Sequence, residues 1–218
     1  MPGVPGFLTS VRIGGTPVAL SDEPMVDVGG SPNLIFRVTD VTRRILDPAA
    51  TFVFGSGAGS PTAIPAADVV SINYLAGTVT FSVSPTLPVV IQSGNYIPVS
   101  FIAGAHTYGL SCSSDLLDNT TFESAKTSTQ RQKQVGLLDV SVSVDRFDEG
   151  DLTIRTFLEN RTRVLIEITP GSGTLIARGW FVPESENRQG AIAELESAPL
   201  VFQLDGDDKV DFDFIETA

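Results

Sequence analysis

The sequence contains one cysteine and one histidine, Cys112 and His106, among its 218 residues. One cysteine excludes an internal disulfide, and the alternating stretch 109–113 predicts that Cys112 points into a core as a small apolar side chain. Redox or nucleophilic chemistry would need an activating partner, so a Cys112/His106 pair stays open. The chain has no nucleophile elbow, phosphate-binding loop or dinucleotide fingerprint. We therefore expect no enzyme, no cofactor and no metal site.

Positive charge is also scarce, with 14 Lys and Arg against 26 Asp and Glu and a net charge of −12. Such a surface repels polyanions, which argues against a protein that wraps nucleic acid. The alternative interpretation is that this charge only keeps the protein soluble. No apolar run reaches the roughly 20 residues that cross a bilayer, and no basic region followed by an apolar run opens the chain. Neither a membrane partner nor a signal peptide is expected.

The composition is that of an all-β chain, with 42% hydrophobic residues, 20 Gly and 14 Pro. It is long enough for one large or two small β domains. Residues 1–20 combine a Pro/Gly-rich arm with a predicted strand, Phe7–Ile13, and a Gly14-Gly15 turn. The arm is expected to stay unfolded or to become ordered only against a neighbouring subunit.

Residues 21–100 predict a small β module with few charges. Strands are expected over 33–38, 51–54 and 87–99, and Gly55–Pro65 is expected to be a flexible loop. The clearest hairpin is 69–83, which turns at Ala76-Gly77. Its predicted apolar positions are Ile72, Tyr74, Val79, Phe81 and Val83.

A second β region begins at Phe101–Cys112 and is followed by a long polar stretch, 119–134, in which Phe122 is the only large apolar residue. Such a long stretch without a pattern is either a mobile surface loop or a loop that becomes ordered against another subunit. The second reading makes a set of residues candidates for contact between subunits. They are Asn119, Thr120, Thr121, Phe122, Glu123, Arg131 and Lys133.

One helix is expected within this second region. The strand 137–144 alternates, with Leu138, Val140, Val142 and Val144 on one face. A helix over 148–160 follows, with acidic residues at its start, an apolar stripe of Ile154, Phe157 and Leu158, and Arg161 and Arg163 after its end. Alternating strands are then expected over 163–168 and 175–182, joined by a turn at 170–173, with one or two further strands over 191–204. Trp180 is expected to anchor a core or an interface.

The C-terminal region carries the densest group of carboxylates. Its members are Asp205, Asp207, Asp208, Asp211 and Asp213. Carboxylates of this kind suit calcium, but the spacing does not match an EF-hand loop. Alternation would place Asp211 and Asp213 opposite Phe212 and Phe214, so a solvated strand edge is the favoured interpretation.

The chain resembles the tail tube (major tail) proteins of long-tailed bacteriophages over about residues 101–218. The resemblance depends on features in a fixed order: DLLDNTTFES and its polar loop, GLLDVSVSVDRFDEGD before the helix, RVLIEITPGSG before a hairpin, and RGWFVPESENRQGAIAELESAPLVFQL. The segment RVTDVTRRILDP…SINYLAGTVTFS looks like the extra β module that some members carry.

The resemblance implies a β-sandwich or barrel flanked by one short α-helix, with an additional N-terminal β module. It implies domains at 1–20, 21–100 and 101–218, with the helix near 148–160. It also implies hexameric rings of this chain, stacked into a tube in the virion through which DNA passes during ejection without sequence-specific binding. Terminator, tape measure and distal tail proteins would be the other partners.

An acidic lumen would keep DNA from adhering, because like charges meet across a weakly screened gap. The candidate lumen-facing residues are Asp139, Asp145 and Asp148, and an ordinary solvated strand face is the alternative for each. A head-to-tail contact that adds one subunit's sheet edge to the next would close a ring. The alternative function is a non-enzymatic β-sandwich that binds a ligand or decorates a capsid.

Overall fold

The structure is a computed structural model that describes residues 10–30, 32–118, 133–147, 153–169, 175–186, 198–205 and 212–216. It is mainly β, as the sequence predicts, and within these residues it has one α-helix. None of its described helices is long and apolar enough to cross a membrane.

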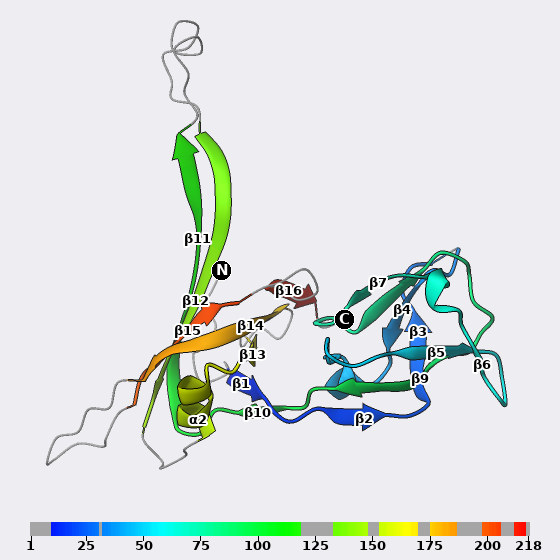
Figure 1. Cartoon of the computed structure of the whole chain (residues 1–218), viewed down its shortest axis with the longest axis horizontal. Coiled ribbons are helices and arrows are strands. Elements are labelled where there is room, and N and C mark those ends of the chain that lie inside the picture. The colour runs from blue at the N-terminus through cyan, green and yellow to red at the C-terminus, as the bar shows by residue number, and fades with distance from the viewer. Residues whose placement is uncertain are drawn as a thin grey trace, which may run out of the picture. The chain divides into compact units, whose positions relative to one another are not determined.

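The strands and helices follow one another along the chain as shown in Figure 1. The N-terminal elements are β1 (Ser10–Gly14), β2 (Val18–Leu20), β3 (Glu23–Asp27), β4 (Ile35–Val38), the short helix η2 (Val41–Arg43), β5 (Val53–Ser56), β6 (Thr62–Ala63), η3 (Ala66–Asp68), β7 (Val69–Asn73), β8 (Thr78–Phe81), β9 (Val89–Tyr96) and β10 (Val99–Phe101). The later elements are β11 (Ala105–Asp118), β12 (Lys133–Arg146), α2 (Thr153–Asn160), β13 (Val164–Thr169), β14 (Leu175–Glu186), β15 (Leu200–Leu204) and β16 (Asp213–Glu216).

Contacts divide the chain into two compact units. The first unit comprises residues 1–102, 164–180 and 206–218, and the second comprises 103–163 and 181–205. Strand β14 begins in the first unit and ends in the second. The sequence-based boundaries at residues 20 and 100 remain a prediction of domain organisation.

In the first unit, strands β2 to β9 form a curled sheet in the order β6-β5-β9-β3-β4-β8-β7, with β2 also paired to β9. Strands β5 and β8 would lie about 19 Å apart if this sheet were flat. Instead the rings of Phe54 on β5 and Phe81 on β8 meet edge to face, with centroids 5.7 Å apart. Phe36 on β4 also contacts Phe81, at 5.8 Å. The sheet therefore folds over a core of its own.

The predicted hairpin at 69–83 is confirmed, and its turn depends on Gly77. Gly77 has a φ of +67°, and a Cβ there would lie 2.8 Å from Cα of Arg44. The backbone needs the left-handed conformation and also leaves no room for a side chain. The strand ends at Phe81, so Val83, predicted to be apolar and inward, is instead 63% exposed.

Gly77→Ala is expected to lower the free energy of unfolding by about 1–3 kcal/mol, because left-handed strain and a backbone clash act together. The matched control is Gly30→Ala, since Gly30 has a φ of +69° but a Cβ added to it would have nothing within 4 Å. Comparing the free energies of unfolding of both variants in urea separates the effect of left-handed strain from that of the clash with Arg44. Equal losses would show that the approach to Arg44 is unimportant.

The remaining strands of the first unit pair in the order β10-β1-β13, and the first part of β14 pairs with β16. A second small core lies against them, formed by Ile45, Leu75, Ile97 and Leu165 with Trp180 packed beside it. This confirms Trp180 as a core anchor. Strand β13 does not alternate as predicted, because every residue from Val164 to Ile168 is buried, including Glu167.

The second unit contains strands in the order β14-β15-β12-β11. The predicted inward face of β12 is confirmed for Val140, Val142 and Val144, which are fully buried. They share a core with Phe202 of β15 and Phe181 of β14. The side chain of Leu138 lies outside the described residues.

The helix α2 covers the described part of the predicted helix, and residues 148–150 and the rest of its acidic start lie outside the described residues. Phe157 and Leu158 are half-buried, as the apolar stripe predicts. The helix ends in a Schellman motif: the backbone N–H of Thr162 donates to the carbonyl of Phe157, and that of Arg161 to Leu158. Arg161 takes the left-handed position, with a φ of +51°.

One other prediction is wrong, and a second can be compared with the structure only in part. The stretch 55–65, expected to be a flexible loop, contains a short antiparallel pairing of β5 with β6, from Gly55↔Ala63 to Ser56↔Thr62. The predicted strand Phe7–Ile13 is described only from Ser10, where β1 starts, and Phe7–Thr9 and the rest of the arm lie outside the described residues. Backbone pairing, which a polar composition does not reveal, accounts for the first difference.

Candidate functional site

The second unit presents a long β-hairpin made of β11 and β12. Each strand has 14 residues, and the pairing runs from Ala105↔Arg146 to Asp118↔Lys133. At about 3.3 Å per residue, such strands extend for roughly 45 Å. Strand β12 pairs with β15 only over Ser141–Val144, so much of the hairpin consists of two strands alone (Figure 1).

Strand β11 is an edge strand, since among the described strands it pairs only with β12. Its other edge therefore offers a row of backbone N–H and C=O groups to a further strand. Long edges of this kind are templates for pairing with another chain. Among the described strands β11 is the longest with an open edge, and its pairing with β12 has register shifts next to Ala105 and Ser114.

The outward face of the hairpin is polar, and over residues 107–113 and 139–145 it has no lysine or arginine. Cross-strand pairs on this face join Ser113 to Asp139, Ser111 to Ser141, Gly109 to Ser143 and Thr107 to Asp145. Asp139 and Asp145 are both exposed, and the amide of Gln203 donates to Asp139. Six residues separate the two carboxylates, which is about 20 Å along a strand. Small polar side chains fill the space between them.

The other candidate residues from the sequence are placed only in part. Lys133 is the first residue of β12, where it pairs with Asp118. Asn119, Thr120, Thr121, Phe122, Glu123, Arg131 and Asp148 lie outside the described residues. The roles predicted for lumen and inter-subunit residues thus stay predictions.

The prediction that Cys112 is buried is wrong. Cys112 pairs with Val140 and so shares the face of the buried valines, but it is exposed because it belongs to the edge strand. His106 stacks on Phe147, with ring centroids 4.4 Å apart. Six residues of the same strand, about 20 Å, separate His106 from Cys112, so the two do not form a catalytic pair.

Arg146, at the end of β12, is a fully buried cation. Its Nη2 donates to Glu186 Oε1 at 2.8 Å, and its backbone carbonyl accepts from the N–H of Ala198 at 2.9 Å. Its Nε and Nη1 have no partner within the described structure. A buried pair of this kind fixes the strand end where β12 gives way to the helix region.

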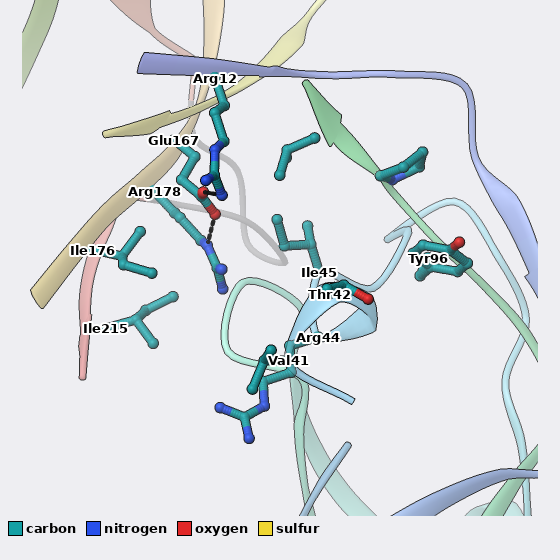
Figure 2. Close-up of a pocket in the computed structure, with 12 residues that line it drawn as sticks. Arg12, Val41, Thr42, Arg44, Ile45, Tyr96, Glu167, Ile176, Arg178 and Ile215 are labelled. Carbon is teal, nitrogen blue, oxygen red and sulfur yellow. Dashed lines mark hydrogen bonds and ion pairs between the residues drawn. The ribbon is translucent and has the colours of Figure 1, made fainter. Parts of the chain in front are cut away.

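The first unit contains a pocket of about 410 Å³. Its polar wall is formed by Arg12 on β1, Glu167 on β13 and Arg178 on β14 (Figure 2). Arg12 Nη1 donates to Glu167 Oε1 at 3.1 Å, and Arg178 Nε donates to Glu167 Oε2 at 2.7 Å. Arg178 Nη1 also donates to the carbonyl of Leu75 at 2.8 Å, which ties β14 to the loop after β7.

The other walls of the pocket are mostly apolar. They comprise Val41, Thr42, Arg44, Ile45, Tyr96, Pro98, Val99, Ile176 and Ile215. In Figure 2, Ile176 and Ile215 lie at the left, and Ile45 and Tyr96 lie at the right. This pocket was not predicted from the sequence, although a glutamate within the apolar run VLIEI was a usable signal.

Two groups at the η2 helix, Arg44 and Asp40, have lowered pKa values for different reasons. Burial, with Arg37 and Arg178 nearby, lowers the pKa of Arg44 below its usual value. Hydrogen bonds from the side chain and backbone N–H of Thr42 lower the pKa of Asp40, which caps η2. Arg44 and Arg178, which both line this pocket, thus lie close enough for their charges to interact.

The C-terminal carboxylates are only partly described. Asp205 pairs with Arg163 at 2.9 Å, and Asp213 is exposed on β16. Asp207, Asp208 and Asp211 lie outside the described residues. In the described part of the chain, no group of three or more His, Cys, Asp or Glu side chains is placed to hold a metal ion.

No protein-family model and no curated protein matches this chain. Several solved structures are similar to it, including the following two. One, described as the tail of an empty GTA particle computed with helical refinement in C6 symmetry, is 20% identical with a TM-score of 0.45, over 56% of this chain and 87% of that one. The other, the virion of a native gene transfer agent (GTA) particle, is 18% identical with a TM-score of 0.43, over 55% and 89%. The assignment to a phage tail remains a prediction from the sequence features quoted above.

Proposed function

We propose that this chain is a structural, non-enzymatic subunit of a phage tail tube, which assembles through its sheet edges into stacked rings that conduct DNA. The observation that carries the proposal is β11, a 14-residue strand paired along one edge only within the described structure. Pairing that edge with a neighbouring subunit satisfies its backbone groups and removes the hazard of an open edge.

The outward face of the hairpin suits the wall of a DNA conduit. Side chains there are small and polar, and its charged members Asp139 and Asp145 are acidic. Carboxylates repel phosphates, and over residues 107–113 and 139–145 this face has no lysine or arginine to hold the DNA backbone. We infer that these residues face the lumen, in rings of the sixfold symmetry that the family resemblance implies.

The first test is the assembly state of the purified protein. At high concentration, negative-stain micrographs are expected to show rings or tubes. A chain that stays a monomer or small oligomer at every concentration would contradict the proposal and favour a ligand-binding or capsid-decorating module. Association with terminator, tape measure and distal tail proteins is tested by whether those proteins cosediment with the assembled tubes.

A deletion tests the segment between β11 and β12. Because Asp118 and Lys133 are cross-strand partners, residues 119–132 can be replaced by Asn-Gly in a two-residue turn. The variant is expected to keep the circular dichroism and unfolding curve of the parent but to form no tubes, since the removed segment is proposed to bridge rings. A Gly/Ser replacement of the same length is the matched control, and tubes from either variant would show that the native loop sequence is dispensable.

A further inference from the structure

We propose that the pocket between β1, β13, β14 and η2 binds a carboxylate carried on an apolar group. The polar wall holds a buried anchor: Glu167 is 1% exposed and Arg178 is 6% exposed. All residues that line the pocket belong to the first unit, so one compact body forms the site.

Unused hydrogen-bond donors point to an anionic ligand. Towards the described residues, Arg12 uses only Nη1 and Arg178 uses only Nε and Nη1 in hydrogen bonds. A guanidinium has further N–H donors in a rigid fork that matches a carboxylate. Arg12 is also held in place over the ring of Phe101, at 4.9 Å from its centroid, so its orientation is fixed before a ligand arrives.

The charge balance of the lining favours the same ligand. Arg12 and Arg178 line the polar wall together with one carboxylate, that of Glu167, which leaves a surplus of one positive charge among the described residues of this wall. This surplus lies within a chain whose net charge is −12. A carboxylate would compensate it.

The rest of the lining selects what carries the carboxylate. Ile45, Val99, Ile176 and Ile215 offer apolar surface, while Thr42 and Tyr96 add hydroxyl groups. A volume of about 410 Å³ falls in the range of small-ligand pockets, and it suits a group the size of one or two amino-acid residues. Such a group is either a free organic acid or an acidic side chain of a second copy, and only the second source depends on the proposed assembly.

The test uses the full chain at a concentration below that of self-association, with 4-methylpentanoate as the probe in a calorimetric titration. The uncharged 4-methylpentanamide has the same shape, and inorganic phosphate supplies an anion without the apolar part. Saturable binding of the carboxylate, at least about tenfold tighter than the amide, is expected from charged hydrogen bonds. Equal binding of acid and amide, or no saturable binding of the acid, would overturn the proposal, as would phosphate binding as tightly as the acid.

Variants locate the site. Arg12→Met is expected to weaken binding about tenfold or more, and Arg12→Lys to weaken it less, because lysine keeps the charge but loses the fork. Arg43→Met is the matched control: Arg43 adjoins Arg44 but pairs with Glu23 at 2.6 Å and does not line the pocket. The affinity of the Arg43→Met variant for 4-methylpentanoate should stay within about twofold of that of the parent. If Arg43→Met weakened binding as much as Arg12→Met, the site would lie elsewhere.

A second arm identifies the source of the carboxylate. If a second copy supplies it, saturating 4-methylpentanoate reduces self-association in sedimentation velocity, and Arg12→Met does the same. If self-association is unchanged by both while the acid still binds, the ligand is a free organic acid. A chain that binds the acid but never assembles would contradict the proposed tail function and leave the carboxylate site standing.

Discussion

Glu167→Leu is expected to lower the free energy of unfolding by about 3–5 kcal/mol, the usual cost of removing one partner from a buried ion pair. Glu167 accepts hydrogen bonds from both Arg12 and Arg178, and the side chain of Arg178 is itself 7% exposed. The substitution leaves a buried guanidinium without its counter-charge. Urea denaturation followed by tryptophan fluorescence measures the change, since Trp180 packs beside the same core.

Two further variants show whether the loss comes from the unpaired charge. Replacing both partners, in Glu167→Leu/Arg178→Met, removes the buried charge together with its counter-ion and should be more stable than the single variant. Glu159→Gln breaks the Arg155–Glu159 pair, whose side chains are 55% and 61% exposed, and should cost only about 0.3–0.5 kcal/mol. A double variant as unstable as Glu167→Leu would mean that the lost contacts, and not the charge, set the cost.

Phe81→Ala is expected to lower the free energy of unfolding by about 3–5 kcal/mol, the range found when a buried phenylalanine is truncated. Its ring is buried between Phe36 and Phe54, at centroid distances of 5.8 Å and 5.7 Å. The contact with Phe54 joins β8 to β5, the strands next to the two ends of the curled sheet, so its loss also opens the closure of this sheet. Hydrogen exchange should show faster exchange of the amides of β4, β5 and β8 than in the parent.

The matched control for Phe81→Ala is Val83→Ala, two residues further along the chain. Val83 is exposed and follows the end of β8, so its truncation should change stability by less than about 0.5 kcal/mol. If both variants lost stability equally, the module would lack the core described for it. If Phe81→Ala changed exchange equally in all strands of the chain, the module would not unfold as a unit of its own.

Local patterns were enough to predict the hairpin at 69–83 and the buried face of β12. In both, side chains alternate with the period of a strand, and a glycine turn or a valine series marks the register. The curl of the sheet that brings Phe54 to Phe81 could not be predicted, because it depends on contacts between strands that are distant in sequence. The same limit applies to β6, whose two residues form a strand only by pairing with β5.

Burial was predicted less well than secondary structure. Alternation implies one buried and one solvated face, yet β13 is covered on both, and its Glu167 is buried because two arginines from other strands meet it. Cys112 shows the opposite failure: it lies on the core face of its strand and is exposed because β11 is an edge. Neither strand order nor the location of a counter-ion is encoded in a local window of sequence.

The exposure of two candidate residues was predicted correctly, and their role in a lumen stays a prediction. Asp139 and Asp145 were chosen as the polar face of one strand, and the structure places both on the exposed side of the hairpin with small polar neighbours on β11. The pocket with Arg12, Glu167 and Arg178 was not foreseen, since Arg12 lies 155 residues before Glu167 along the chain and only the fold brings their strands together.

A single exposed thiol has a practical consequence for anyone who follows assembly. Cys112 is the sole cysteine of the chain and lies on β11. A maleimide fluorophore therefore reacts at one defined location without any prior engineering. Dyes brought close together by stacking of labelled molecules quench one another, so the kinetics of polymerisation can be followed as a loss of light, and unlabelled protein mixed in would restore the signal.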